Sequence, residues 1–193
     1  LLYSSLYAFI ITEVGFKENT YEQIQALQSS FTGGINASFK LHTSDIDSPG
    51  QLFLSISSKS LDKNFDAMEE LILSTLKKAR FDEKNRIWDL LNIFIARNEE
   101  SLNQNGHILA MNSAASSLNA FSASAYQMSG LQMLHQSKAA ISKMKKVADA
   151  NKLIDTLQTI HSKIISSPFK IFTACSPKAL TDKTFEFENI ESK

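Results

Sequence analysis

Apolar residues crowd the first sixteen positions of the chain and are not confined to one helical face. The run LLYSSLYAFIITEVGF, at 1–16, predicts a helix that is buried on most of its sides. Asn19 and Thr20 can then cap a second helix, and Glu22 and Gln23 stand where capping-box partners belong. Apolar residues at helical spacing predict this second helix over about 20–31.

After residue 33 the helical spacing gives way to a strict alternation of apolar and polar residues. This alternation predicts a strand over 34–42, whose apolar face is formed by Ile35, Ala37, Phe39 and Leu41. A turn over 44–50 and a second alternating run over 51–58 complete the pattern of an antiparallel hairpin with one apolar side. Gly33 and Gly34 lie between the second helix and the first strand. We interpret them as a structural turn whose backbone angles a side chain would resist.

The rest of the chain returns to helical spacing and ends with one more strand-like run. Helices are predicted over about 62–80, from 82 towards Gly106, over about 131–145 and over about 149–165, and FKIFTAC at 169–175 predicts a strand. The Ala- and Ser-rich segment 107–130 predicts a tightly packed helix, with Ala110 and Ala114 facing another helix at close range. The fold class is therefore α+β, an antiparallel sheet packed against several helices. With 193 residues we expect a single domain over 1–193.

Composition narrows the classes of partner. The chain has 20 Lys+Arg and 20 Asp+Glu residues, so it lacks the basic excess of a general nucleic-acid binder. Its longest apolar run, at 6–11, is too short to span a bilayer, and we expect no membrane partner. The single cysteine, Cys175, favours a reducing compartment. Because the chain opens without Met inside a predicted helix, we expect it to be a piece of a longer polypeptide.

The sequence offers no catalytic constellation of its own. None of the histidines, which are His42, His107, His135 and His161, has a second ligand at zinc-site spacing. Cys175 has no activating base nearby in the sequence. We therefore predict no catalytic residue and no metal site in this chain, and no cofactor.

Three segments together resemble a known family. They are TEVGFKENTYEQIQALQSSFTGGINASF at 12–39, LDKNFDAMEELI at 61–72, and NGHILAMNSAASSL with the following SGLQML at 105–134. They resemble the third domain of presequence proteases, in the pitrilysin and insulin-degrading family of zinc metallopeptidases. The resemblance implies one of four homologous α+β domains that close around a peptide chamber. It also implies that this domain has lost the zinc motif His-x-x-Glu-His that the first domain carries.

The resemblance assigns residues as follows. Counting back from Gly15 places the motif positions near Leu6, Phe9 and Ile10, which are all apolar. Zinc would then be bound by the parent enzyme outside this chain, and the parent would be a zinc metalloendopeptidase. The implied partners are the other domains of the same polypeptide and the peptide substrates of the parent. Asn36 and Lys40 are the residues of this chain that could contact substrate in the chamber.

Two alternatives stay open at this point. Subunits of respiratory complexes share this fold without peptidase activity, so the chain could be a structural subunit or a protein-interaction domain with no link to proteolysis. An unrelated helical interaction module is the third reading, and it predicts no hairpin over 34–58. The compartment is not readable from this sequence: the cytoplasm is expected for a bacterial parent and an organelle matrix for a eukaryotic one.

Overall fold

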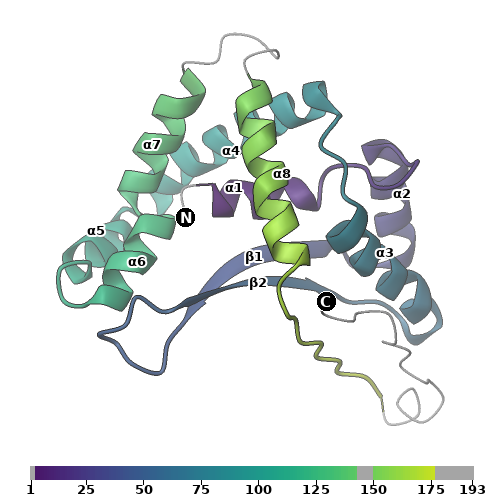
Figure 1. Ribbon diagram of the computed structural model, residues 1–193, viewed down its shortest axis with the longest axis horizontal. Coiled ribbons are helices and arrows are strands. Elements are labelled where there is room, and N and C mark those ends of the chain that lie inside the picture. The colour runs from purple at the N-terminus through teal and green to yellow at the C-terminus, as the bar shows by residue number, and fades with distance from the viewer. Residues whose placement is uncertain (1–2, 143–149, 177–193) are drawn as a thin grey trace.

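The computed structural model describes residues 3–142 and 150–176, which form a series of helices interrupted by one β-hairpin (Figure 1). The elements in chain order are α1 (Ser4–Ile11), α2 (Tyr21–Phe31), β1 (Ile35–His42), β2 (Gln51–Ser58), the 3₁₀ turn η1 (Asp62–Asn64), α3 (Phe65–Lys78), α4 (Lys84–Gln104), α5 (Gly106–Ala115), α6 (Ala120–Ser129), α7 (Leu131–Ser142) and α8 (Asn151–Ile165). The α+β prediction is confirmed. Within the described residues, no helix is long and apolar enough to cross a membrane.

The hairpin forms a two-stranded antiparallel sheet, as its alternation predicts. Ile35 pairs with Ser58 at one end and His42 pairs with Gln51 at the other. The helices gather on one side of the sheet, and the strands curve beneath them (Figure 1). The residues of β1 that face the helices are buried or half-buried, whereas the alternate residues Asn36, Ser38, Lys40 and His42 are exposed.

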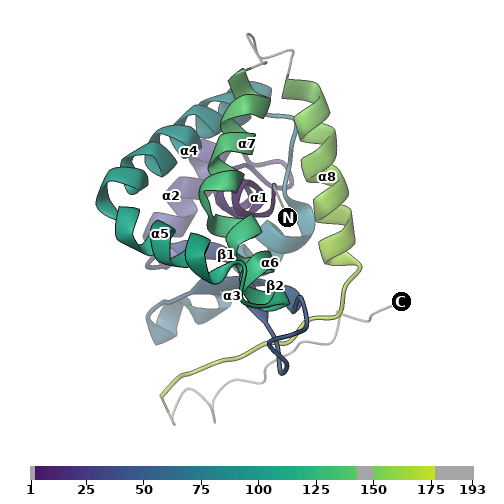
Figure 2. The ribbon, with the colours of Figure 1, turned by 90° about the vertical axis from the view of Figure 1, so that its left-hand side faces the viewer.

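The helix α1 is the centre of the main hydrophobic core. Its residues Leu6, Tyr7, Ile10 and Ile11 are almost fully buried. Around them pack buried residues of α4 and α8 and the half-buried Phe39 and Leu54 of the hairpin. The views of Figures 1 and 2 agree that α1 lies between the sheet below and the longer helices around it. The prediction of a first helix buried on most sides is confirmed over Ser4–Ile11, but residues 12–16 of the predicted range are not helical.

A smaller cluster holds α2 and α3 against the start of β1. It consists of the buried residues Phe16, Ile24, Ile35 and Leu71. The helix α2 begins where the sequence predicts, because the Thr20 side chain and the Gln23 side chain form a reciprocal capping box.

The predicted strand over 169–175 is wrong. Residues 168–176 are exposed and take no regular secondary structure. The alternation of Phe169, Ile171 and Thr173 indicates strand propensity. A strand also needs a neighbouring strand edge with which to pair, and propensity alone does not provide that edge. At the end of this segment the Ser176 hydroxyl lies 3.3 Å from an Asp62 carboxylate oxygen.

The Ala- and Ser-rich segment also differs from its prediction. It forms two helices, α5 and α6, and the second begins at a cap in which the Asn119 side chain accepts from the Ser122 N–H. Ala110 and Ala114 are exposed, so the prediction that both face another helix of this chain is wrong. Small side chains permit close helix packing, but they do not specify which surface comes close. The helix predicted over 131–145 is observed to Ser142, and 143–145 lie outside the described residues.

Candidate functional site

The positions that the resemblance aligns with a zinc motif lie on α1. Leu6 is 1% exposed and Ile10 is fully buried within the main core. The ring centroid of Phe9 lies 5.8 Å from that of Phe94, and the Arg97 guanidinium lies 5.1 Å from the Phe9 centroid. None of these side chains offers an atom that ligates zinc. The face of α1 that they form is a packing surface, and its residues do not fit a metal ion.

A polar pair of the buried Tyr7 and the half-buried His161 lies beside this face. The Tyr7 hydroxyl lies 2.8 Å from His161 Nδ1, which joins α1 to α8. Burial raises the pKa of Tyr7 and lowers the pKa of His161, because both charged forms lose hydration there. Both groups are therefore neutral at neutral pH. The sequence indicates that His161 is partly covered, because it follows Leu157 by four residues on the apolar stripe of α8. It does not indicate that Tyr7 is the partner.

Two residues hold the loop after α1 in place. They are Glu83, which immediately precedes α4, and Arg86 in the first turn of α4. Glu83 accepts hydrogen bonds from the Gly15 N–H at 2.7 Å and from the Tyr21 N–H at 3.2 Å. Arg86 donates to the Glu13 carbonyl at 3.2 Å and to the Glu13 carboxylate at 2.9 Å. A Cβ at Gly15 would lie 2.4 Å from the Asn19 carbonyl oxygen, so this close approach requires glycine. The sequence pattern gave no signal for Glu83 and Arg86, because their roles depend on contacts more than sixty residues away.

The two glycines of the predicted turn connect α2 to β1. Gly34 has φ +97°, a conformation that side chains resist, and the space around it is open. The prediction of such an angle at Gly33 is wrong, because its φ is not positive; a Cβ there would lie 2.7 Å from the flexible Lys59 side chain. The Gly33 N–H donates to the Lys59 carbonyl at 2.8 Å, and the Ser58 hydroxyl donates to the Gly34 carbonyl at 2.9 Å. The turn thereby fixes where β1 starts beside β2.

The residues predicted to contact substrate lie together on the outer face of the hairpin. Asn36 pairs with Ser57 and Lys40 pairs with Phe53 across the two strands. Phe53 is 49% exposed and its ring makes an edge contact with His42 at a centroid distance of 6.0 Å. This face is solvated and carries one cation and one aromatic ring near each other. The assignment of Asn36 and Lys40 to substrate contact stays a prediction.

The histidines are dispersed over the fold. His42, His107 and His135 are exposed on three different elements, and His161 is paired with Tyr7. Over residues 3–142 and 150–176, no three His, Cys, Asp or Glu side chains come together as a metal-binding group. Cys175 is exposed at the end of the described chain.

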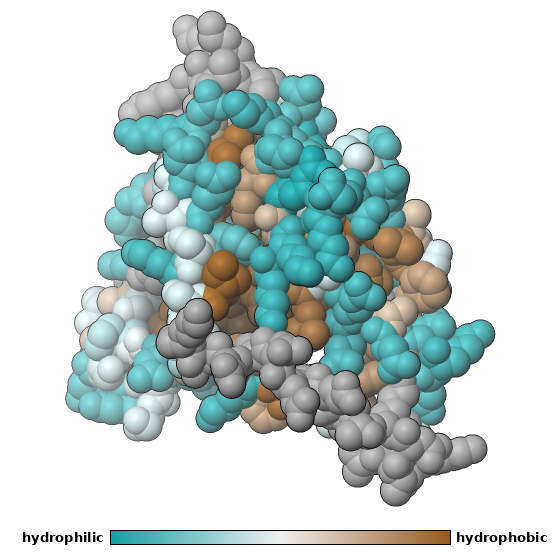
Figure 3. All heavy atoms as spheres, turned by 45° about the vertical axis from the view of Figure 1, so that its right-hand side comes forward, coloured by the Kyte–Doolittle hydropathy of each residue, from teal (hydrophilic) through white to brown (hydrophobic). Residues whose placement is uncertain are grey.

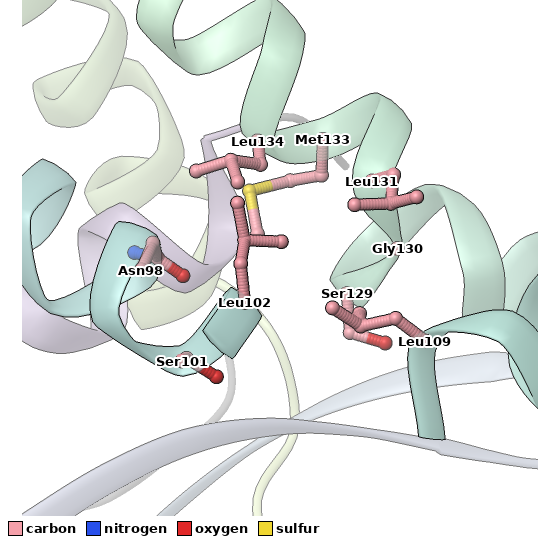
Figure 4. Close-up of a pocket in the computed structure, with 9 residues that line it drawn as sticks. All are labelled: Asn98, Ser101, Leu102, Leu109, Ser129, Gly130, Leu131, Met133 and Leu134. Carbon is pink, nitrogen blue, oxygen red and sulfur yellow. The ribbon is translucent and has the colours of Figure 1, made fainter. Parts of the chain in front are cut away.

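A small cavity lies where α4, α5 and the junction of α6 and α7 meet (Figure 4). Its volume is about 40 Å³, which is room for a few water molecules. Figure 4 shows Leu102, Met133 and Leu134 on one side of it and Leu109 of α5 on another. The cavity is much smaller than the clefts of roughly 300–1,000 Å³ that hold drug-sized ligands.

Comparison with known proteins adds one finding. The model of a family described as associated with peptidases of family M16, subfamily C, matches residues 1–139, which is well over half of the chain. The match includes α1, the hairpin and all of α5 and α6. Among curated proteins, none matches this chain.

Proposed function

This chain belongs to the family of domains associated with subfamily C of the M16 peptidases, and from that premise we propose that it is a non-catalytic domain of a zinc-dependent peptidase of the presequence-protease type. Its role is to form part of the wall of a closed chamber in which the parent enzyme degrades peptides. Membership of the family indicates that the domain sits with other domains of one polypeptide. The zinc ion belongs to another domain of that polypeptide.

The observation that carries this proposal is the burial of α1. A catalytic zinc site needs about three protein ligands and an open position for water. The aligned positions Leu6 and Ile10 supply alkyl groups within a closed core, and Phe9 supplies a ring packed on Phe94. A helix of this composition stabilises the domain and leaves the chemistry to residues elsewhere in the parent.

The hairpin would form part of the chamber wall under this proposal. Its inner face packs on α1, and its outer face presents Asn36, Lys40 and Phe53 to solvent. An extended peptide can bind a sheet through main-chain hydrogen bonds at an open edge and through side chains on the adjoining face. We place this face toward the chamber, with Asn36 and Lys40 as the residues that would contact substrate.

The test begins with the parent reading frame. We expect a His-x-x-Glu-His motif upstream of this chain. The purified parent is expected to hold about one zinc per molecule and to cleave a quenched fluorescent peptide in a chelator-sensitive manner. Replacing the motif glutamate by glutamine should abolish cleavage and leave the zinc content largely unchanged. A parent without the motif, or one that holds no zinc, would favour the structural-subunit reading.

A second measurement concerns this chain alone. Residues 1–193, expressed without a histidine tag and dialysed, should retain no stoichiometric zinc and should not cleave the peptide. Stoichiometric zinc in this sample would contradict the non-catalytic assignment, because it would require a ligand set that α1 does not supply.

A further inference from the structure

The helix α5 exposes most of its apolar residues on the side that faces away from the domain. Its outward stripe follows helical spacing and continues into the turn after the helix. We call it the α5 face, and it consists of His107, Ile108, Ala110, Met111, Ala114 and Leu118. All six residues are exposed; Met111 is 67% and Leu118 is 76% exposed. The inward side has the half-buried Leu109, which lines the small cavity over α4. Figure 2 shows α5 on the side of the molecule turned toward the viewer.

The absence of charge around α5 is unusual for a solvated surface. Residues 101–137 contain no Asp, Glu, Lys or Arg, although the whole chain has 40 such residues among 193. Solvent-exposed helices normally carry such residues on their outer side. Another exposed face, seen in Figure 3, is covered mostly by hydrophilic residues, with hydrophobic ones in separate areas. A single exposed leucine needs no explanation, but Ile108, Met111 and Leu118 are exposed together within an uncharged region, which favours an interaction surface.

The stability of α5 gives an independent reason for a cover. The helix has ten residues, none of which is buried, and it has no charged residue in its first or last turn. An isolated helix of this length is marginal in water, because helices in proteins are stabilised mainly by tertiary packing of an apolar face. In α5 the larger apolar face points outward, toward Ile108 and Met111. A cover over this outward face would add to the packing that Leu109 supplies on the inward side.

From these observations we infer that the α5 face docks against an uncharged, apolar surface of another domain of the same polypeptide. This inference rests on the proposed function for the presence of that domain. The charge pattern determines the chemistry of the occupant, since a charged surface would lose hydration here without gaining an opposite charge. Ala110 and Ala114 leave room for a helix or strand of the neighbour to come close beside Met111.

Covalent linkage favours a neighbouring domain over a second copy of the chain. A surface on the same polypeptide is present at an effective concentration in the millimolar range, whereas a second copy must associate from dilute solution. A peptide ligand is disfavoured, because the cavity that α5 helps to form lies on the side opposite the α5 face.

The test uses the full-length parent protein with a photo-cross-linking residue, benzoylphenylalanine, in place of Met111. We expect cross-links to peptides of the same polypeptide outside residues 1–193. The matched control places the same residue at Ala96, which is exposed on α4 beside Arg97, and should give a much lower yield of those cross-links. Cross-links between two copies, or no protein cross-link at position 111, would overturn the inference.

A pair of substitutions provides a second readout in the same protein. Met111→Glu places a carboxylate in the docked face and should speed hydrogen exchange of the 106–118 amides roughly tenfold or more. Ser113→Glu, on the same helix but outside the α5 face, should leave the exchange near the parent rate. Equal exchange in the two variants would contradict docking at this face.

The outcome can be separated from that of the proposed function. A parent that binds zinc and cleaves peptides, yet gives no cross-link from position 111, refutes the docking and leaves the peptidase assignment in place. A parent without zinc or cleavage that does give the interdomain cross-link refutes the peptidase assignment alone.

Discussion

The helices α1 and α5 are both short and uncharged, yet they occupy opposite situations in the fold. The first is surrounded by the hairpin, α4 and α8, and supplies the largest fully buried side chains, Tyr7, Leu6 and Ile10. The second has no buried residue and exposes Ile108 and Met111. Absence of charge is therefore shared by a helix that this chain covers and by a helix that it leaves exposed, so it does not indicate where a cover lies. In α1 the cover is internal, and for α5 we place it in a neighbouring domain.

The largest expected effect comes from truncating equivalent residues in the two helices. Ile10→Ala removes buried methyl groups from the core and should lower the free energy of unfolding of residues 1–193 by roughly 2–5 kcal/mol. Ile108→Ala removes the same groups from an exposed position and should change it by less than about 0.5 kcal/mol. Urea unfolding of both variants measures the difference. Equal losses would show that α5 is covered within this chain.

The turn before β1 tests what holds the hairpin against α1. Gly34→Val forces a side chain into a conformation with φ +97° and should cost roughly 1–3 kcal/mol of stability. The position has open space, so strain in the backbone is the expected cause. The ring centroids of Phe39 in β1 and Tyr7 in α1 lie 6.2 Å apart. Loss of this turn should therefore also weaken the packing of β1 on α1.

Gly33→Val is the matched control for that change. Its side chain would displace the flexible Lys59 side chain without requiring a positive φ, and the cost should be smaller than at Gly34. Thermal melts in which Gly33→Val is the more damaging of the two would contradict this account of the turn.

The contact between Tyr7 of α1 and the half-buried His161 of α8 should make stability depend on pH. Burial lowers the pKa of His161 below the unfolded value of about 6.5. The unfolded chain therefore binds a proton at a higher pH than the folded chain does. The contribution of His161 to the free energy of unfolding should be fully present above about pH 6.5. It should be lost as the pH falls from there toward the pKa of the folded state.

Melting temperatures of residues 1–193 at pH 8 and pH 5 measure this effect. His161→Gln removes the titrating group and should reduce the difference between the two temperatures. His135→Gln, at an exposed position, should leave the difference nearly unchanged. A His161→Gln variant with the full pH dependence would assign the effect to other groups.

The sequence predicts best where a pattern is satisfied by near neighbours. The capping box of Thr20 and Gln23 and the alternation over 35–42 are local, and both elements form as predicted. The run at 169–175 has the same strand-like composition, but its structure depends on whether a distant edge is available, and no periodicity reports that. The prediction that Ala110 and Ala114 face another helix failed for a related reason. The size of a residue shows how closely another helix can approach, but not on which side it does so.

In the candidate site, too, local features could be predicted from the sequence and contacts between distant residues could not. The apolar character of Leu6, Phe9 and Ile10 can be read directly, and it carries the assignment of α1 as a packing helix. The pairs Tyr7–His161 and Gly15–Glu83 join residues 154 and 68 positions apart, so one sequence gives no means to match them. Their individual members carry signals, a histidine on an apolar stripe and a glycine in a loop, without indicating a partner.

The smallest effect is expected at Ala114, where the sequence alone predicts overpacking against another helix of the chain. The structure places Ala114 in solvent, so Ala114→Leu should change the free energy of unfolding of residues 1–193 by less than about 0.5 kcal/mol. In the full-length parent the same residue lies on the α5 face, and a larger side chain there would crowd the docked neighbour at a cost of roughly 1–3 kcal/mol. Thermal melts of both proteins measure the contrast. A large loss in residues 1–193 would restore an internal cover for α5, and no loss in either protein would place this side of the helix in solvent throughout.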